Sequence, residues 1–220
     1  FVTASHCDVG ENGLGTTGPV YQPTTAYSQV GVIELNPAWS IVDSRCNGYA
    51  KCAYADAMYV RYTDHSAWNA RVAKTASMGT NYAGGSISVA GWWTNIPYVA
   101  GEYVGQPLEK IGRTTGWTGG TLSQSCVNWS LPGSHTIICA MRVTGSRVGS
   151  GDSGSPVFRR ISNTIYPVGI LWAGEATPPA YFEELEPNIF VCRMAGCSYL
   201  FSNWNYATIT HLQRQFEPTS

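Results

Sequence analysis

Charged residues are scarce in this chain. Asp, Glu, Lys and Arg together make up 12% of its 220 residues, and the formal net charge is −1. Nucleic acids and anionic membrane surfaces are usually bound by dense basic patches, which this composition does not supply. We therefore expect no nucleic acid and no membrane as a partner.

Long apolar runs are missing as well. No segment approaches the roughly twenty apolar residues of a membrane-spanning helix. The opening residues Phe-Val-Thr-Ala-Ser-His lack the basic and apolar parts of a signal peptide. If the protein is secreted, its targeting segment has been removed, and other parts of the natural chain could have been removed with it.

Metal-binding motifs are also absent. Zinc sites usually contain Cys-x-x-Cys pairs or clustered histidines, and neither occurs among the seven cysteines and four histidines. The acids in Glu183-Glu184-Leu185-Glu186 form a short charged run, which is usually a solvated loop. The sequence therefore predicts no metal ion and no cofactor.

Glycine, proline and β-forming residues are abundant. The 24 glycines and 12 prolines, with many Thr, Tyr and Trp residues, favour short strands joined by tight turns. We expect an all-β fold with one helix at 206–216, where apolar residues recur at helical spacing. Turn signals at 97–107 suggest a boundary between units 1–104 and 105–220. The expected strands are 29–35, 54–62, 86–91, 108–112, 119–127, 136–143, 155–158 and 166–172.

The cysteines indicate an oxidising compartment, and therefore a secreted, extracellular protein. Their spacing allows three short loops to be closed by disulfides, and one cysteine is left over. The expected pairs are Cys46 with Cys52, Cys126 with Cys139 and Cys192 with Cys197, and the remaining cysteine is Cys7.

The strongest signal for chemistry is a tight turn around Ser153. It reads Gly-Asp-Ser-Gly-Ser-Pro over residues 151–156. A nucleophilic serine needs small neighbours, so that a substrate can reach its hydroxyl, and backbone N–H groups where negative charge develops. Gly151 and Ser153 can supply those two donors. A plain surface turn is the alternative, but the whole hexapeptide between two expected strands favours a functional interpretation.

A base for this serine is expected at His6. The residues Thr-Ala-Ser-His-Cys at 3–7 end an apolar strand with an imidazole, whose near-neutral pKa suits proton exchange with a hydroxyl. The other histidines lie in polar segments or on the expected terminal helix, and we interpret them as surface residues: His65, His135 and His211.

A carboxylate is needed to orient the imidazole and to stabilise its charged form. Asp56 stands at the head of an apolar strand, where a buried acid is costly unless it meets a cation or a hydrogen-bond donor. Asp64 is the second candidate. Asp8 and Asp43 lie in expected loops, and we interpret them as solvated turn residues.

These three motifs resemble a known family. Thr-Ala-Ser-His-Cys, then Ala-Asp-Ala-Met-Tyr-Val at 55–60, then Gly-Asp-Ser-Gly-Ser-Pro follow the His, Asp, Ser order of chymotrypsin-like peptidases. Gly-Arg-Thr-Thr-Gly-Trp at 112–117 and Val-Gly-Ile-Leu-Trp at 168–172 are most similar to the secreted bacterial branch of streptogrisin and alpha-lytic protease. The resemblance covers residues 6–172.

The resemblance implies two six-stranded antiparallel β-barrels and a secreted serine endopeptidase that cleaves protein or peptide substrates through an acyl-enzyme. Its triad would be His6 and Asp56 in the first barrel and Ser153 in the second. The first barrel would lack the strands that precede the histidine motif in the family, and with them the cysteine that pairs with Cys7. The alternative is a catalytically silent binding protein of the same fold or an inactive fragment.

The resemblance also implies supporting residues and a pocket. In the family, an arginine of the Gly-Arg-Thr-Thr-Gly motif pairs with the aspartate before the serine, which assigns Arg113 and Asp152 to support of the oxyanion loop. No carboxylate lies between residues 140 and 151, so we expect a preference for an apolar or small side chain over Lys or Arg. The expected pocket walls are Val148, Leu171, Trp172 and Ala173.

Overall fold

The structure is a computed structural model. The described residues are 1–7, 18–21, 28–36, 46, 51–63, 71–78, 89–95, 103–131, 135–176, 182–186, 189–192 and 197–203. The predicted helix at 206–216, Asp64 and most of the predicted strand at 86–91 lie outside them.

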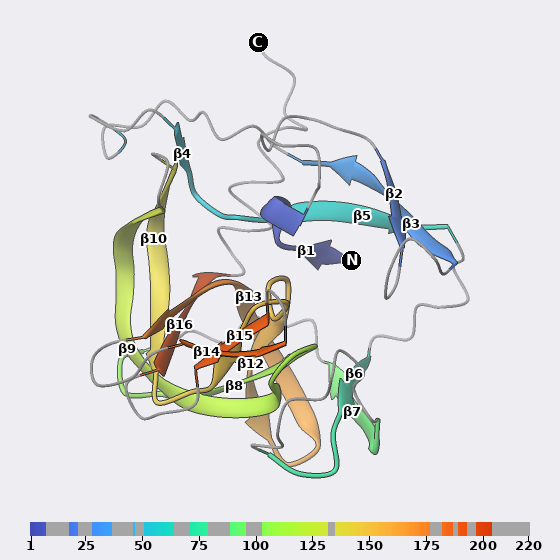
Figure 1. The fold of residues 1–220 in the computed structure, drawn as a ribbon. Helices are drawn as coiled ribbons and strands as arrows, with labels where there is room; N and C mark the ends of the chain where they lie inside the picture. The colour runs from blue at the N-terminus through green and yellow to red at the C-terminus, as the bar shows by residue number, and fades with distance from the viewer. Residues whose placement is uncertain are drawn as a thin grey trace.

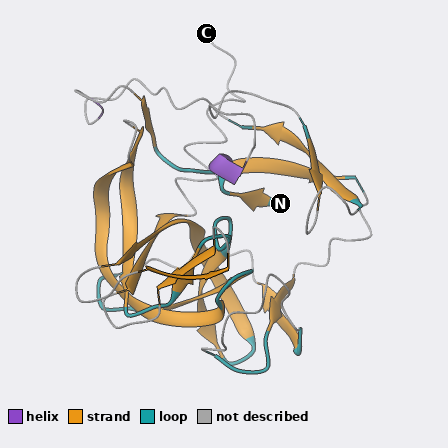
Figure 2. Ribbon diagram, in the orientation of Figure 1, coloured by secondary structure: helices purple, strands orange, loops and turns teal. Residues whose placement is uncertain are grey.

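Strands dominate the described part of the chain (Figures 1 and 2). Its one helical element is a 3-10 turn, η1, at Ser5–Cys7, and no described helix has the length and hydropathy needed to span a membrane. The strands are β1 Val2–Thr3, β2 Pro19–Tyr21, β3 Gln29–Leu35, β4 Lys51–Ala53, β5 Met58–Tyr62, β6 Arg71–Lys74, β7 Gly91–Asn95, β8 Pro107–Gly112, β9 Gly116–Leu131, β10 His135–Thr144, β11 Val148–Gly149, β12 Pro156–Ile161, β13 Thr164–Ala176, β14 Phe182–Glu186, β15 Ile189–Cys192 and β16 Cys197–Asn203.

The first sheet is antiparallel and has the strand order β1-β5-β3-β2. Ile33 on β3 pairs with Val60 on β5, and both side chains are buried in a small apolar cluster with Met58. Alternation along β3 puts the buried residues Gly31 and Ile33 on one face of the predicted strand. This sheet carries the N-terminal segment that leads into η1.

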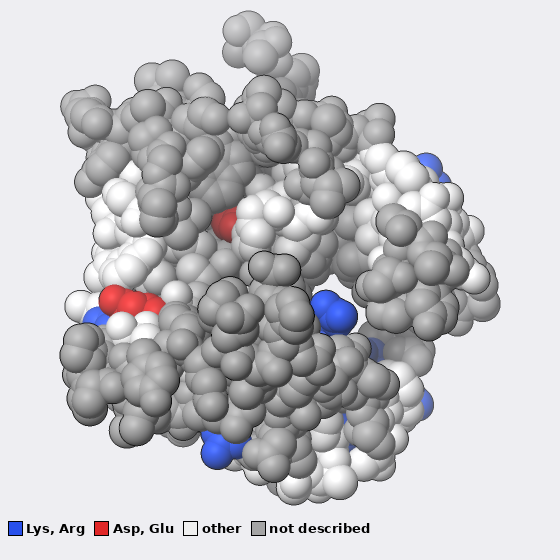
Figure 3. Space-filling view, viewed as in Figure 1, with Lys and Arg blue, Asp and Glu red and all other residues white. Residues whose placement is uncertain are grey.

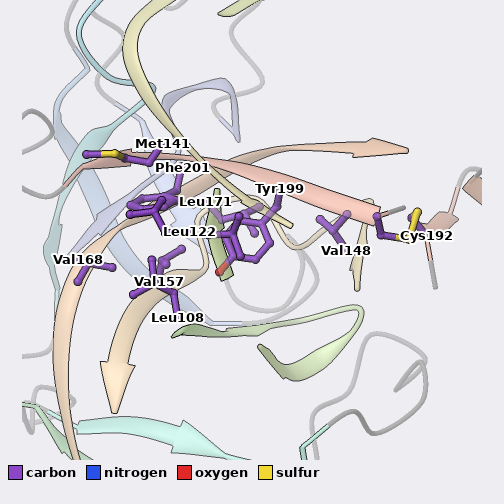
Figure 4. Packing of buried hydrophobic residues seen from close by; sticks show 12 residues of the cluster. Leu108, Leu122, Met141, Val148, Val157, Val168, Leu171, Cys192, Tyr199 and Phe201 are labelled. Atoms are coloured by element: carbon purple, nitrogen blue, oxygen red, sulfur yellow. A yellow bond between two sulfur atoms is a disulfide. The ribbon is translucent and has the colours of Figure 1, made fainter. Parts of the chain in front are cut away.

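The second sheet is larger and has the order β12-β8-β9-β10-β16-β13-β7-β6. Its long strands β9 and β10 curve around one side of the molecule (Figure 1). Apolar side chains from β8, β9, β12, β13 and β16 meet inside it and form the main core (Figure 4). Members of this core include Leu108, Leu122, Val157, Leu171, Tyr199 and Phe201.

A crossing segment connects the two sheets and determines where Asp56 lies. β4 pairs in parallel with β10 of the second sheet, with Ala53 opposite Ile137, and the chain then passes through residues 54–57 into β5 of the first sheet. All four crossing residues are buried. The strand predicted at 54–62 was therefore wrong in its first part, because this part leaves one sheet before it joins the other.

The other strand predictions with described residues are largely confirmed. The segments 29–35 and 108–112 form β3 and β8, whereas 119–127 and 136–143 are the inner parts of the longer strands β9 and β10. Residues 183–186, which we expected to be a solvated loop, lie in β14, part of a small sheet with β15 and β11. Strand pairing does not mark the proposed boundary at residue 105, since β4, β6 and β7 pair within the second sheet. That boundary stays a prediction.

All three predicted disulfides are present. They join Cys46 to Cys52, Cys126 to Cys139 and Cys192 to Cys197, and Cys7 is left as a free, exposed cysteine. The Cys46–Cys52 bridge packs against Tyr54 and Ile138 at the start of the crossing segment. On the face drawn in Figure 3, the charged side chains of the described residues are few and scattered.

Candidate active site

His6 and Asp56 come from two segments next to the first sheet, one that leaves it and one that enters it. His6 lies in η1 directly after β1, and Asp56 lies in the buried crossing before β5. The His6 ring contacts the Asp56 carboxylate through Nδ1, and the backbone N–H of His6 donates to Asp56 Oδ1 at 3.0 Å. The Asp56 side chain is fully buried, whereas that of His6 is 40% exposed. The carboxylate is thus held inside while the imidazole reaches the surface.

Asp56 is also held by the second sheet. Its backbone N–H donates to the hydroxyl of Ser202 on β16 at 3.1 Å, and Ser202 is buried. The position of the carboxylate therefore depends on both sheets. We did not predict Ser202 from the sequence, because a single serine in an apolar strand forms no recognisable motif.

Ser153 lies 147 residues after His6 in the chain but next to it in space. Its Oγ is 2.8 Å from His6 Nε2. Because an ionised Asp56 can only accept hydrogen bonds, the hydrogen of a neutral imidazole lies on Nδ1, and Nε2 accepts from the Ser153 hydroxyl. The three residues predicted from separate motifs therefore form one continuous chain of hydrogen bonds.

The surroundings of His6 favour its protonated form. Partial burial by itself lowers the pKa of His6, but the hydrogen bond to Asp56 and the negative charge of Asp56 outweigh this effect and raise the pKa above its ordinary value. An imidazole in this setting is a good proton acceptor, since the imidazolium that forms is stabilised by a neighbouring carboxylate.

Backbone hydrogen bonds fix the turn that carries Ser153. The N–H of Asp152 donates to Gly149 O, and the N–H of Ser155 donates to Asp152 O, each at 3.0 Å. The N–H groups of Gly151 and Ser153 have no acceptor among the described residues. Two unused donors beside a serine hydroxyl are the arrangement that stabilises a developing oxyanion.

The cation that pairs with Asp152 is Lys110, and the prediction that it would be Arg113 was wrong. Lys110 Nζ lies 2.9 Å from Asp152 Oδ2, and both side chains are fully buried. Arg113 is exposed in the turn between β8 and β9. Lys110 lies on the same face of β8 as the buried Leu108, which directs its side chain inward. That alternation was the sequence signal that could have identified Lys110.

The Asp152 carboxylate also accepts several neutral hydrogen bonds. Its Oδ1 receives the backbone N–H groups of Thr114 at 2.8 Å and Thr115 at 3.1 Å. Its Oδ2 receives the Thr115 hydroxyl at 2.6 Å and the N–H of Gly149 at 3.1 Å. Burial lowers the pKa of Lys110, and the charge and hydrogen bond of Asp152 oppose this effect only in part.

Two glycines allow these close approaches. A Cβ on Gly112 would lie 2.3 Å from Asp152 Oδ1, so only glycine leaves room for the carboxylate at this point. Gly154 has φ +82°, and a Cβ there would lie 2.0 Å from Thr3 Oγ1 on β1. The second contact brings the Ser153 turn against the strand that leads into His6.

A cavity of about 390 Å³ opens beside Ser153. All four predicted wall residues line it, and none of the described residues that line it is charged. The lining residues are Val148, Gly149, Ser150, Ser153, Leu171, Trp172, Ala173 and Gly174.

A free thiol, that of Cys7, directly follows His6 in the chain. Desolvation by the neighbouring protein and the negative charge of Asp56 raise the pKa of the Cys7 thiol to about 11, so the thiol is protonated at neutral pH. Among the described residues, no group of three or more His, Cys, Asp or Glu side chains is placed to hold a metal ion.

The fold is the chymotrypsin-like double β-barrel, as predicted. The six strands expected in each barrel are not shown, since the described strands form sheets of four, nine and three strands, and the expected C-terminal helix lies outside the described residues. A glutamic-acid-specific serine protease that uses a histidine triad in substrate binding matches with a TM-score of 0.59 and 22% identity, covering 92% of this chain and 79% of its own. Thermobifida fusca protease A matches with a TM-score of 0.56 and 20% identity, covering 93% of this chain and 77% of its own. Cellulomonas bogoriensis chymotrypsin matches with a TM-score of 0.54 and 21% identity, covering 93% of this chain and 79% of its own.

Sequence comparisons add nothing to this structural likeness. A scan against models of protein families gives no match, and neither does a sequence search of curated proteins. The predicted resemblance to the bacterial chymotrypsin-like branch is therefore confirmed at the level of the fold.

Proposed function

We propose that the protein is a secreted serine endopeptidase, which hydrolyses peptide bonds in protein or peptide substrates. The observation that carries the proposal is the hydrogen-bond chain from Asp56 through His6 to Ser153, which ends beside an open cavity. The three disulfides support the extracellular setting, because such bonds persist in oxidising compartments.

The reaction follows from the roles that these groups can take. Ser153 Oγ attacks the carbonyl carbon of the substrate while His6 Nε2 accepts the hydroxyl proton. The carbonyl oxygen becomes negatively charged and is stabilised by the N–H groups of Gly151 and Ser153. His6 then gives its proton to the leaving amine, and the peptide C–N bond breaks. A water molecule releases the acyl group by the same steps, again with His6 as base and acid.

The cavity supports a preference for an apolar side chain on the residue before the cleaved bond. A charged substrate side chain would lose its hydration in this cavity without meeting an opposite charge from the described lining residues. The protease that is specific for glutamic acid binds its substrate through a histidine triad. The described lining of this cavity includes no histidine, so glutamate is not the expected preference.

Labelling with a fluorophosphonate tests the activity. The Ser153 oxygen would bond to phosphorus and displace fluoride, and mass spectrometry of the modified peptide identifies the serine. Ser153→Ala should abolish labelling, whereas Ser125→Ala, a change of an exposed serine on β9, should leave it intact. A folded protein that does not react would refute the proposal and favour a silent binding protein of this fold.

A panel of peptide substrates tests the preference. The substrates differ only in the residue before the cleaved bond, which is Ala, Leu, Phe, Arg or Glu. We expect kcat/KM for the best apolar residue to exceed that for Arg and Glu by about 10²-fold or more, since burying an unpaired charge costs several kcal/mol. Equal rates for Arg and Leu would contradict the assignment of the pocket.

A further inference from the structure

Arg113 has an exposed side chain on a backbone that is tied to the interior. It lies in the turn between β8 and β9. The next residue, Thr114, is buried, and its backbone N–H donates to Asp152 Oδ1 at 2.8 Å. The hydroxyl of Thr114 donates to the carbonyl oxygen of Ser150. These bonds fix the base of the Arg113 side chain against the turn that carries Ser153.

The Arg113 guanidinium lies next to Gly151. A Cβ built on Gly151 would lie 3.5 Å from Arg113 Nη1, which is an ordinary contact distance. Gly151 has φ +89°, a conformation that glycine adopts readily, and its N–H is one of the two donors of the proposed oxyanion site. A substrate whose carbonyl oxygen meets this N–H therefore comes close to a positive charge.

The position of the cavity indicates which part of the substrate lies near Arg113. The residue before the cleaved bond enters the cavity, and the described lining of that cavity includes neither Gly151 nor Arg113. The carbonyl carbon at Ser153 carries this residue on one side and the leaving amine on the other. Arg113 therefore lies toward the leaving amine and the residues that follow it.

The chemistry of Arg113 suits a carboxylate. A guanidinium has five N–H donors in a planar fork, which can bind both oxygens of a carboxylate. Arg113 already takes part in an interaction within the chain, but five donors can serve a ligand as well. The two carboxylates of the site, those of Asp56 and Asp152, are fully buried. They are therefore shielded from a substrate that passes over the surface.

We propose that Arg113 is a specificity-determining residue on the leaving side of the site, where its guanidinium binds a carboxylate on the first or second residue after the cleaved bond. This inference rests on the proposed function. It adds an acidic group after the cleaved bond to the apolar residue expected before it. An acidic side chain and the C-terminus of a short peptide both supply this group.

Matched peptides test the assignment. All share one apolar residue before the cleaved bond, and they carry Asp, Asn or Lys at the first or second position after it, with an amidated C-terminus. A second pair compares a free with an amidated C-terminus, and a third places Asp or Asn two residues before the bond. The proteins are the starting protein, Arg113→Gln, Arg113→Glu and the control Arg71→Gln, which changes an exposed arginine on the edge strand β6.

We expect kcat/KM for the carboxylate to exceed that for its neutral partner by about fivefold in the starting protein and in Arg71→Gln, as for a well-formed exposed ion pair. Asp with a neutral end identifies a side-chain carboxylate, and the second pair identifies a C-terminal one. The ratio should approach one in Arg113→Gln, and Arg113→Glu should prefer Lys to Asn. In the starting protein the ratio should fall between about 0.05 and about 0.5 M salt, because salt screens exposed charges.

Several results would overturn the assignment. These are equal rates for carboxylate and neutral partner in the starting protein, a preference for Asp only before the cleaved bond, and a preference for the carboxylate that persists in Arg113→Gln. If the Arg113 variants do not fold, a ratio that is constant with salt would refute the ion pair. Failure to hydrolyse any peptide would refute the proposed function and this inference with it, whereas hydrolysis that ignores the acid would refute this inference alone.

Discussion

Replacing Gly112 by alanine should disturb the protein far more than the size of a methyl group suggests. The added Cβ would lie 2.3 Å from Asp152 Oδ1, 2.6 Å from Asp152 Cγ and 2.8 Å from Ser155 Oγ. Ordinary contact begins at 3.4 Å, so Oδ1 must move by about 1.1 Å. Such a movement would break the bonds that Oδ1 accepts from Thr114 and Thr115 at 2.8 and 3.1 Å.

The free energy of unfolding should fall by the sum of two effects. Overpacking of a filled interior costs about 1–3 kcal/mol, and loss of buried hydrogen bonds to a charged group adds about 1.5–3 kcal/mol. A total of about 2.5–6 kcal/mol corresponds to a decrease in Tm of roughly 5–24 °C for a chain of this length. Because Asp152 also holds the Ser153 turn, the rate of labelling by a fluorophosphonate should fall as well.

Thermal unfolding followed by tryptophan fluorescence measures the loss of stability, and labelling kinetics measure the change in the reactivity of Ser153. Gly18→Ala is the control, because a Cβ at that position meets no atom within 4 Å and should shift Tm by only about 1–2 °C. A Gly112→Ala variant with the Tm of the starting protein would show that Asp152 does not pack against residue 112. The network around Lys110 would then be wrong in its geometry.

Four further predictions concern the triad and one disulfide. Asp56→Asn should slow labelling of Ser153 by about 10⁴-fold with little loss of folding, since an amide that donates to Nδ1 leaves the wrong nitrogen protonated; a loss under tenfold would contradict the role of Asp56. Labelling should require neutral His6 and therefore rise with pH through a midpoint above the ordinary histidine value, since Asp56 raises this pKa. The raised pKa of His6 also stabilises the folded protein. This contribution should be fully present below the pKa that His6 has in the unfolded chain and should be lost as pH rises through the pKa that it has in the folded protein. Unfolding midpoints measured from pH 5 to 9, compared with those of Asp56→Asn, would detect it. Replacing both Cys192 and Cys197 by alanine should lower stability by about 2 kcal/mol, because the disulfide closes only a short loop, and urea unfolding measures this change.

Local patterns were enough to predict much of the fold. β3 and β8 could be located because alternating side chains and flanking turn residues act over a few positions. The disulfides could be paired because each joins cysteines that are close in the chain. The crossing segment before β5 could not be distinguished from a strand, since its residues are as apolar as those of the strand that follows.

The candidate site was only partly predictable for a related reason. The motifs around His6, Asp56 and Ser153 each require particular neighbours, so the residues could be identified one motif at a time. The motif around Arg113 suggested the wrong cation, because a motif records which residues are adjacent and not which side chains point inward. The inward direction of Lys110 depends on the pairing of β8 with β9 and β12.

The sequence by itself determined the all-β class, the disulfide pairs and the candidate triad, since these depend on composition, spacing and short motifs. Only the tertiary structure decided that Lys110 neutralises Asp152, that Ser202 holds Asp56, and that the pocket walls enclose a cavity beside Ser153. Those contacts join segments that are distant in the chain. They arise from how strands pair and which faces are buried, and these are properties of the whole sheet and not of any one segment.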